Sequence, residues 1–335
     1  MYHPRLYGSF YDMGLKYGSL LYEKAGFQIP VMSKERTQFG IASHEILKTF
    51  YPEIIEEIEG FAKGIKAEPA IVGGFLLTIG IFDMNAQCSA FACKNNDSVL
   101  MGRNYDMLFA FKKYSQSSLT APTGKYAHIN HSDAFIGCED GINEKGLAIA
   151  MTFVNGASKQ PGVGFYFMVR RILEECATIE EAIAIINTAK VSKANNFLIA
   201  DKKGGMVVVE SAPGKTVARY PAAGENFIHT TNQFISREMQ AYDIGGVDWS
   251  KSRERYERVG NRLKESGGLS FENAKEVLSD HCVCLDLEKH KFGTIWSIVA
   301  DLDTLRIERA ETKPKINNYK PDTRLDWWLK KKKTK

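Results

Sequence analysis

The hydrophobic periodicity of the chain changes at Cys88, and this change constrains the fold more than any other feature of the sequence. Across residues 46–65, apolar residues recur at steps of three and four with charged residues between them, a pattern that predicts one long amphipathic helix. A second helical pattern covers residues 13–23. The first 87 residues, called the leading block below, are therefore expected to be mostly helical.

Short runs of alternating character follow Cys88 and predict β-strands: SAFA, SVLMGR, AFIGCED and GLAIAMTFV. Turn-forming residues at 94–97 and 141–146 separate the runs, which favours antiparallel hairpins. Helical periodicity returns over residues 165–188, where Thr178 is placed to cap the second of two helices.

The remainder of the chain keeps its strands and helices in separate groups. Four further strand patterns end at NFIHTTN, helices are predicted over 252–265 and 271–278, and a last strand pair surrounds Asp301-Leu302-Asp303. Segregation of this kind predicts an α+β fold with mainly antiparallel sheets and argues against a doubly wound α/β fold. The absence of repeats and long linkers in the sequence favours one integrated domain after the leading block.

Composition excludes several function classes. The net charge is +4, but the lysines at 330–335 supply much of it, so the body gives no basis for binding nucleic acid. The most apolar stretch, residues 70–82, is too short to cross a bilayer, and we expect a cytoplasmic protein without a membrane partner. The six cysteines lack metal-ligand spacing, so neither a metal nor another cofactor is expected.

Cys88 is the strongest candidate nucleophile, although an isolated cysteine is most often a small buried apolar residue. Catalysis needs the thiolate, which a cation or base must support. A hairpin turning at 94–97 would bring Arg103 and Asp106 back towards Cys88. An alternative is a Cys88/His229/Asn232 triad, but the Gly before and the Trp or Tyr after such a cysteine are absent.

Five segments in order carry a resemblance to a known family: CSAFA, LMGRNYDM, DGINEKGLAIA, IHTTNQF and SRERYERV. Together they resemble the N-terminal-nucleophile hydrolases. Within these they are most similar to the acyl-coenzyme A:6-aminopenicillanic-acid acyltransferase group, which is related to choloylglycine hydrolases and penicillin V acylases. The resemblance extends over nearly the whole chain, from GSFYDMGLKYG to TIWSIVADLDTLRIER.

This resemblance implies a four-layer αββα sandwich in which residues 1–87 are a propeptide and residues 88–335 form the catalytic core. It also implies cleavage between Gln87 and Cys88, after which the α-amine of Cys88 serves as the base. An α-amine has an ordinary pKa of about 7.7 to 8, which suits proton transfer near neutral pH. Relatives often carry Gly where this chain has Gln87, so we expect slow cleavage.

The resemblance also assigns roles to residues around the nucleophile. Arg103 would support the thiolate of Cys88, and Asp106 would orient the α-amine. Asn232 would donate its side-chain amide to the oxyanion, an interaction worth about 3 to 4 kcal/mol in acyl transfer. An arginine of the SRERYERV segment would connect these groups, and Arg255 is preferred over its neighbours at 253 and 258.

The implied activity is that of an autoprocessing cysteine amidase or acyltransferase acting on a linear amide C–N bond. Its partner would be a small-molecule amide or acyl substrate, and assembly into a homo-oligomer is compatible with the sequence. The loops that carry Phe109, Phe111, Phe153 and Asn155 are expected to line the substrate pocket. Two alternatives stay open: a Cys88/His229 cysteine hydrolase without processing, and a non-catalytic binding protein that keeps the fold.

Overall fold

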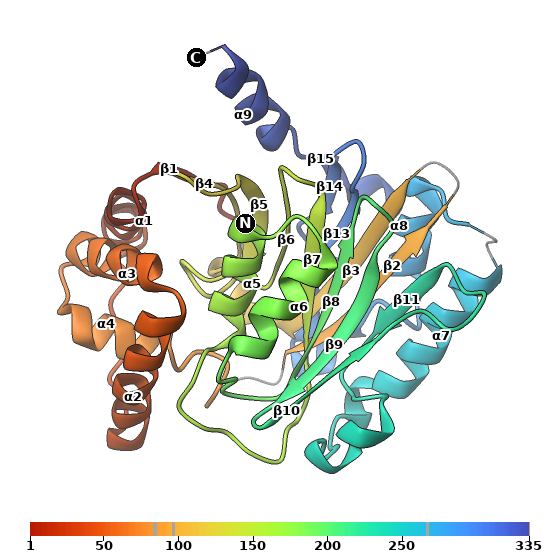
Figure 1. The fold of residues 1–335 in the computed structure, drawn as a ribbon, viewed down its shortest axis with the longest axis horizontal. Helices are drawn as coiled ribbons and strands as arrows, with labels where there is room; N and C mark the ends of the chain where they lie inside the picture. The colour runs from red at the N-terminus through yellow and green to blue at the C-terminus, as the bar shows by residue number, and fades with distance from the viewer. Residues whose placement is uncertain (83–85, 96–97, 266–267, 335) are drawn as a thin grey trace.

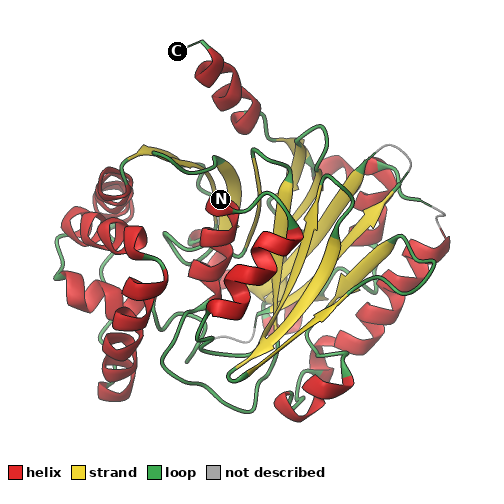
Figure 2. Ribbon diagram, viewed as in Figure 1, coloured by secondary structure: helices red, strands yellow, loops and turns green. Residues whose placement is uncertain are grey.

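Two β-sheets stacked face to face form the centre of the computed structural model, which describes residues 1–82, 86–95, 98–265 and 268–334 (Figure 2). The first sheet has eight strands in the order β1-β4-β5-β6-β7-β8-β9-β10. These strands are β1 (Arg5–Gly8), β4 (Gln116–Pro122), β5 (His128–Ser132), β6 (Asp140–Asn143), β7 (Leu147–Phe153), β8 (Asn195–Asp201), β9 (Met206–Ala212) and β10 (Lys215–Arg219).

The second sheet has the order β11-β2-β3-β13-β14-β15, with β12 paired to β13. Its strands are β11 (Phe227–Thr230), β2 (Gln87–Lys94), β3 (Val99–Leu108), β13 (Phe292–Asp301), β14 (Arg306–Ala310), β15 (Lys320–Pro321) and β12 (Asp286–Leu287). The predicted strand pair around Asp301-Leu302-Asp303 is confirmed as β13 and β14.

Helices cover the outer face of each sheet, which gives the sequence of layers αββα (Figure 1). On the first sheet lie α5 (Phe165–Glu175) and α6 (Ile179–Thr188), and on the second lie α7 (Ser252–Glu265) and α8 (Phe271–Ser279). Thr178 accepts a hydrogen bond from the Glu181 backbone in a capping box at the start of α6, so the predicted cap is confirmed. The four-layer fold expected from the sequence is thereby confirmed.

Alternation of side chains along the strands separates the layers. On β7, Leu147 and Ile149 pack towards the outer helices, whereas Ala148 and Ala150 face the second sheet. Cys88 belongs to the same apolar cluster as Ala148 and Ala150, which fills the space between the two sheets. Because side chains alternate along a strand, the thiol is buried between the two sheets.

In its described residues, 1–82 and 86–87, the leading block contains four helices and the strand β1, and its last residue begins β2. The helices are α1 (Phe10–Ala25), α2 (Lys34–Phe50), α3 (Pro52–Ile65) and α4 (Pro69–Leu76). The prediction of one long helix over 46–65 is wrong, because the helix breaks at Tyr51-Pro52. Proline has no backbone N–H and disfavours the helical conformation at the residue before it, so Pro52 starts a new helix.

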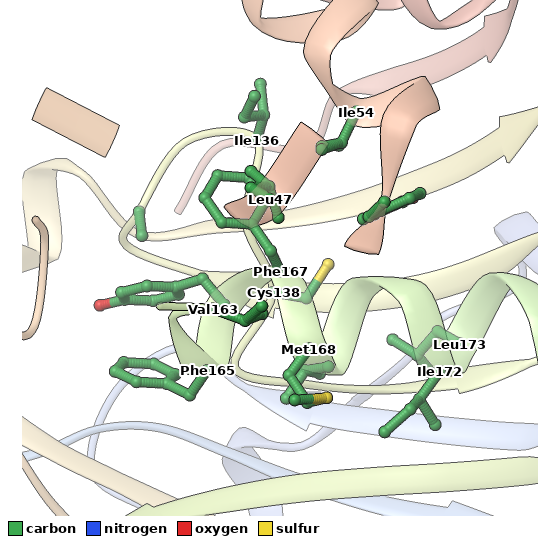
Figure 3. Close-up of a cluster of buried hydrophobic side chains, with 14 of the residues drawn as sticks. Leu47, Ile54, Ile136, Cys138, Val163, Phe165, Phe167, Met168, Ile172 and Leu173 are labelled. Carbon is green, nitrogen blue, oxygen red and sulfur yellow. The ribbon is translucent and has the colours of Figure 1, made fainter. Parts of the chain in front are cut away.

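The leading block is built into the sandwich. Strand β1 pairs in parallel with β4 at the edge of the eight-stranded sheet. Leu47 and Ile54 from the leading block pack in one apolar cluster with Phe167 and Ile172 of α5 (Figure 3). The leading block therefore contributes side chains to the hydrophobic core and a strand to the first sheet.

Two further expectations concern the loops. The run AFIGCED was predicted as a strand, but residues 134–139 form a loop and β6 begins at Asp140. Phe135 has a φ of 61°, which an extended strand does not allow. The turn predicted at 94–97 includes residues 96 and 97, which lie outside the described residues. Among the helices that the structure describes, including α9 (Arg324–Lys333), none is long and apolar enough to cross a membrane.

Candidate active site

Cys88 lies near the start of β2, and its thiol meets a buried arginine. The register pairs Cys88 with Tyr105 and Ala90 with Arg103 on the adjacent strand β3. Directly opposed residues share a face of the sheet, so the hairpin brings Arg103 to the side of the thiol. Nη2 of Arg103 donates to Sγ of Cys88 at 3.3 Å, and both side chains are fully buried.

A set of acceptors holds the guanidinium of Arg103. Nη1 donates to the carboxylate of Asp140, and Nη2 donates to the Met151 carbonyl at 3.0 Å. Nε1 of Trp296 donates to the same Asp140 carboxylate at 3.2 Å, and Glu139 lies 3.7 Å from Nη2. A buried cation needs such partners, and these contacts fix its direction towards the sulfur.

The backbone of Cys88 is held by two side chains from the β11–α7 region. Its N–H donates to Oδ1 of Asn232 at 3.0 Å, and its carbonyl accepts from Nη1 of Arg255 at 2.6 Å. Nη2 of Arg255 also donates to Oδ1 of Asn232 at 2.7 Å. Nδ2 of Asn232 donates to the Phe153 carbonyl at 2.9 Å. The structure therefore joins Cys88, Asn232 and Arg255 in one hydrogen-bonded group.

Of the three candidate arginines on α7, Arg255 is the one that reaches Cys88. Arg255 is completely buried, and its Nε donates to the Ser250 carbonyl at 2.9 Å. Arg253 is exposed, and Nη2 of Arg258 lies 2.7 Å from the Asp280 carboxylate, with its side chain 38% exposed. The face of α7 that points into the protein thus carries Arg255 alone of the three.

Asp106 is buried beside this group but does not bond to the Cys88 N–H in the intact chain. Its Oδ1 accepts from Thr294 at 2.5 Å, and its Oδ2 lies 3.9 Å from Nη1 of Arg255. Burial raises the pKa of Asp106 to about 6, although Arg255 opposes the rise. The carboxyl group therefore titrates close to neutral pH.

Two opposing effects act on the pKa of the Cys88 thiol. Burial raises the pKa of Cys88, and the nearby guanidinium of Arg103 lowers it. The raising effect dominates in the intact chain. The thiol of Cys88 is therefore harder to ionise in the intact chain than an ordinary cysteine.

Gln87 is buried at the start of β2. Its Oε1 accepts from Oγ of Ser250 at 2.6 Å and from Nη2 of Arg255 at 3.4 Å. The peptide bond between Gln87 and Cys88 is thus fixed by side-chain contacts on both of its residues.

His229 does not meet Cys88. The register pairs His229 with Phe91, and Phe91 belongs to the apolar cluster under α7 and α8. The imidazole stacks on Tyr256 at a centroid distance of 4.0 Å. Because Phe91 and Cys88 lie on opposite faces of β2, so do His229 and the thiol.

The four predicted pocket residues are separated. Phe111 lines a cavity of about 670 Å³, and Phe109 packs against the cluster between the sheets. The Phe153 carbonyl accepts from Nδ2 of Asn232, as described above. Nδ2 of Asn155 donates to the Gly245 carbonyl at 2.7 Å. Only Phe111 of these four belongs to the lining of that cavity.

Sequence reasoning missed the residues that support Arg103 and Gln87. Asp140 ends the run AFIGCED, predicted as a strand, and begins the family-like segment DGINEKGLAIA, so a signal for it was present although no role was assigned to it. Trp296 and Ser250 carry no local signal, since each comes from a distant part of the chain and meets the site only through the fold.

Comparisons with known proteins place the chain among acyl-transferring and amide-hydrolysing relatives. The family described as acyl-coenzyme A:6-aminopenicillanic acid acyl-transferase matches residues 93–315. The acyl-coenzyme A:6-aminopenicillanic-acid-acyltransferase 40 kDa form of Emericella nidulans is 21% identical over 266 residues, which cover 77% of this chain and 74% of that protein.

Two solved structures are similar to the fold. A mutant of the conjugated bile acid hydrolase from Clostridium perfringens has a TM-score of 0.52 and 14% identity, over 70% of this chain and 92% of that one. A penicillin V acylase from Agrobacterium tumefaciens has a TM-score of 0.46 and 16% identity, over 67% and 83% of the two chains. The first likeness shows the αββα fold of the N-terminal-nucleophile hydrolases.

Proposed function

The chain belongs to the acyl-coenzyme A:6-aminopenicillanic acid acyl-transferase family, and from this premise we propose that it is a cysteine amidase or acyltransferase that cleaves itself between Gln87 and Cys88. It would then act on a linear amide C–N bond through a thioester at Cys88. The relative from Emericella nidulans is named an acyltransferase, and the structural neighbour from Clostridium perfringens is named a hydrolase. These names support transfer of the acyl group either to an amine or to water.

One observation carries the proposal: Cys88 is contacted at its sulfur by Arg103 (3.3 Å) and at its N–H by Asn232 (3.0 Å). A structural thiol in an apolar core needs neither contact. Desolvating two arginines beside one cysteine is costly, and a chemical role for the positive charge accounts for it.

The first step is self-cleavage. Sγ of Cys88 attacks the carbonyl carbon of Gln87, the C–N bond breaks, and the thiol proton passes to the departing nitrogen, which becomes the α-amine of Cys88. Water then hydrolyses the Gln87 thioester to a carboxylic acid and restores the thiol. The contacts of Ser250 and Arg255 with the Gln87 side chain hold this peptide bond beside the sulfur.

In the processed enzyme the α-amine would take the thiol proton. Because the Cys88 N–H already donates to Oδ1 of Asn232, we assign the orientation of the α-amine to Asn232, with Asp106 stabilising the protonated amine from nearby. The sequence-based assignment had given that orientation to Asp106. For Asn232 to donate to an oxyanion as well, Nδ2 has to leave the Phe153 carbonyl.

Turnover follows the same chemistry. Sγ attacks the substrate carbonyl, the α-ammonium returns its proton to the leaving amine, and the acyl group remains on Cys88 as a thioester. Water or an amine acceptor then takes the acyl group and restores the thiol. Arg103 favours the thiolate at the start and end of each cycle by its charge.

Intact mass of the purified protein tests the proposal directly. We expect two chains, residues 1–87 and 88–335, which copurify, and a single acyl adduct on the second chain after p-nitrophenyl acetate. Cys88→Ala should give one uncut chain without adduct, and Cys93→Ala, the matched cysteine on the same strand, should behave as the parent. An uncut parent that takes up no acyl group would refute the proposal.

A further inference from the structure

Two buried carboxyl groups near Arg103, those of Asp133 and Glu139, take no part in the reaction proposed above. Oε2 of Glu139 lies 3.7 Å from Nη2 of Arg103, which is the nitrogen that donates to Sγ of Cys88. The backbone N–H of Asp133 donates to Oε1 of Glu139 at 3.4 Å, and the two carboxyl groups are close enough to hydrogen-bond each other. The pair therefore reaches the sulfur through a single guanidinium group.

The charge of Arg103 is already matched by another carboxylate. Nη1 of Arg103 donates to Asp140, and Oδ1 of Asp140 lies 2.6 Å from Nδ1 of His131. Burial lowers the pKa of His131, so its imidazole is neutral near pH 7. With Asp140 paired to Arg103, charges on both Asp133 and Glu139 would leave two further carboxylates buried without compensation. Such burial is costly, so the pair of Asp133 and Glu139 holds at least one proton.

The hydrogen bonds indicate which of the two groups holds the proton. Asp133 accepts from two hydroxyl groups, that of Tyr105 at 3.0 Å and that of Tyr166 at 3.4 Å. Within the described residues, no group donates to Oε2 of Glu139, and an ionised oxygen buried in that state is costly. A protonated Oε2 needs no donor and can itself donate to Asp133. Burial raises the pKa of both groups; at Asp133 hydrogen bonds oppose the rise, and at Glu139 the charge of Asp133 adds to it.

We propose that Asp133 and Glu139 share one proton, which Glu139 carries. The neutral Glu139 leaves the positive charge of Arg103 available to the sulfur of Cys88, and both members of the pair are positioning residues that act through Arg103. Loss of the proton would place a carboxylate 3.7 Å from the nitrogen that contacts Sγ, and the thiolate would lose part of its support. The inference rests on the proposed function, because it concerns the charge beside the same nucleophile.

Two isosteric substitutions change the charge of the pair without changing its shape. The measured quantity is the rate at which iodoacetamide alkylates Cys88 at pH 7.5, because this rate follows the thiolate fraction. In Asp133→Asn the charge that raises the pKa of Glu139 is lost, so Glu139 ionises beside Arg103 and the rate should fall by about fivefold. If Glu139 were already ionised in the parent, Asp133→Asn would remove a negative charge and the rate would rise. A rise overturns the inference.

A second substitution at Glu139 should reverse the loss. The double variant Asp133→Asn/Glu139→Gln keeps the shapes of both side chains and has no carboxylate at either position, so Cys88 should be alkylated at least as fast as in the parent. A merely structural effect of Asp133→Asn would persist in the double variant, and that result overturns the inference. Glu144→Gln, which removes a carboxylate that pairs with an exposed lysine, is the control and should leave the rate unchanged.

Infrared absorption measures the proton itself and decides the matter also where Asp133→Asn does not fold. The difference between the spectra of the parent and of Glu139→Gln at pH 8 should contain the C=O band of a protonated carboxylic acid. A difference that contains only carboxylate bands overturns the inference. Neither measurement needs acyl transfer, so the expected order of alkylation rates without any acylation supports the shared proton and refutes the proposed function. Acylation of Cys88 without that order of rates does the reverse.

Discussion

At the scale of single residues, two buried arginines approach Cys88 from different directions. Arg103 contacts the sulfur, and Arg255 contacts the carbonyl and the Asn232 amide oxygen. Each arginine lies beside a buried carboxylate, Asp140 for Arg103 and Asp106 for Arg255. The charges are therefore balanced locally, and changing one member leaves a partner buried without compensation.

The raised pKa of Asp106 leads to a prediction about the pH dependence of Cys88 acylation. Its pKa is raised to about 6 by burial, so the carboxyl group is neutral below that pH and ionised above it. If the ionised form stabilises the α-ammonium, the rate of Cys88 acylation by p-nitrophenyl acetate should rise as the pH increases through about 6. Asp106→Asn should remove this rise and lower the rate at pH 8 by about tenfold or more. A rise near pH 6 that persists in Asp106→Asn would assign it to another group.

For His229 we predict an effect on the pH dependence of folding stability and no effect on acylation of Cys88. Burial lowers its pKa to about 3 from the ordinary value of 6.5, so the folded protein keeps the imidazole neutral while the unfolded chain binds a proton. Its contribution to stability is complete above pH 6.5 and is lost as the pH falls towards 3. At about 1.4 kcal/mol per pH unit, roughly 2 kcal/mol is lost between pH 7 and pH 5.

The matching variant is His229→Gln. Urea unfolding at pH 7 and at pH 5 should show a smaller loss of stability for His229→Gln than for the parent, by roughly 2 kcal/mol. The yield of acyl-enzyme should be unchanged, because the imidazole lies on the far face of β2. Loss of the acyl-enzyme in a folded His229→Gln protein would instead favour the unprocessed cysteine–histidine hydrolase.

At the scale of elements, glycines set the distance between α1 and α3. Gly14 and Gly18 on α1 face the backbone of α3, and Gly60 and Gly64 on α3 face the backbone of α1, each pair spaced by four residues. A Cβ on Gly60 would lie 2.1 Å from the Tyr11 carbonyl oxygen, which is backbone and cannot rotate away. The two helices therefore pack with their backbones in close contact.

Gly60→Ala should separate these helices and reduce the stability of the leading block. We expect a loss of about 1 to 3 kcal/mol in the free energy of unfolding, measured in urea, despite the better helix propensity of alanine. Gly164→Ala is the control, because a Cβ there meets no atom within 4 Å and its φ is −72°. It should change stability by less than about 0.5 kcal/mol. Equal effects of the two variants would contradict the close-packing argument.

At the scale of the whole molecule, a buried ionic cluster joins the leading block to the core. Nη2 of Arg170 on α5 lies 2.7 Å from Glu57 on α3, and its Nε lies 2.5 Å from Glu174. The Tyr51 hydroxyl of the leading block donates to Glu174. Together with β1 in the first sheet, this cluster gives the two parts a shared interior.

Arg170→Met should therefore weaken the attachment of the leading block. Two carboxylates would remain buried without a cation, and we expect a loss of about 3 to 5 kcal/mol in unfolding free energy. In a processed protein, residues 1–87 should separate from residues 88–335 on gel filtration at a lower urea concentration than in the parent. Lys330→Ala, which removes an exposed pair with Asp326, should cost no more than about 1 kcal/mol. Equal urea dependence of parent and Arg170→Met would show that the cluster is not the main attachment.

Sequence reasoning was strongest where a local pattern has a direct structural meaning. The cap at Thr178 and the helix over 252–265 follow from capping chemistry and from apolar spacing, and both are confirmed. The helix predicted across Tyr51-Pro52 was wrong because apolar spacing continues through the break, although proline carried the signal. The strand predicted over 134–140 was wrong for residues 134–139, because an apolar run can also form a loop, as it does around Phe135.

By itself the sequence determined the layered α+β fold, the nucleophile candidate Cys88 and the grouping of Arg103 with it, because a two-strand hairpin aligns residues that are close in the chain. The tertiary structure alone decided which arginine of α7 reaches the site, that Asn232 rather than Asp106 bonds the Cys88 N–H, and that the leading block forms a wall of the cavity. These contacts join segments more than a hundred residues apart, or depend on which face of a helix is buried. No local pattern encodes them, because they follow from how the layers stack.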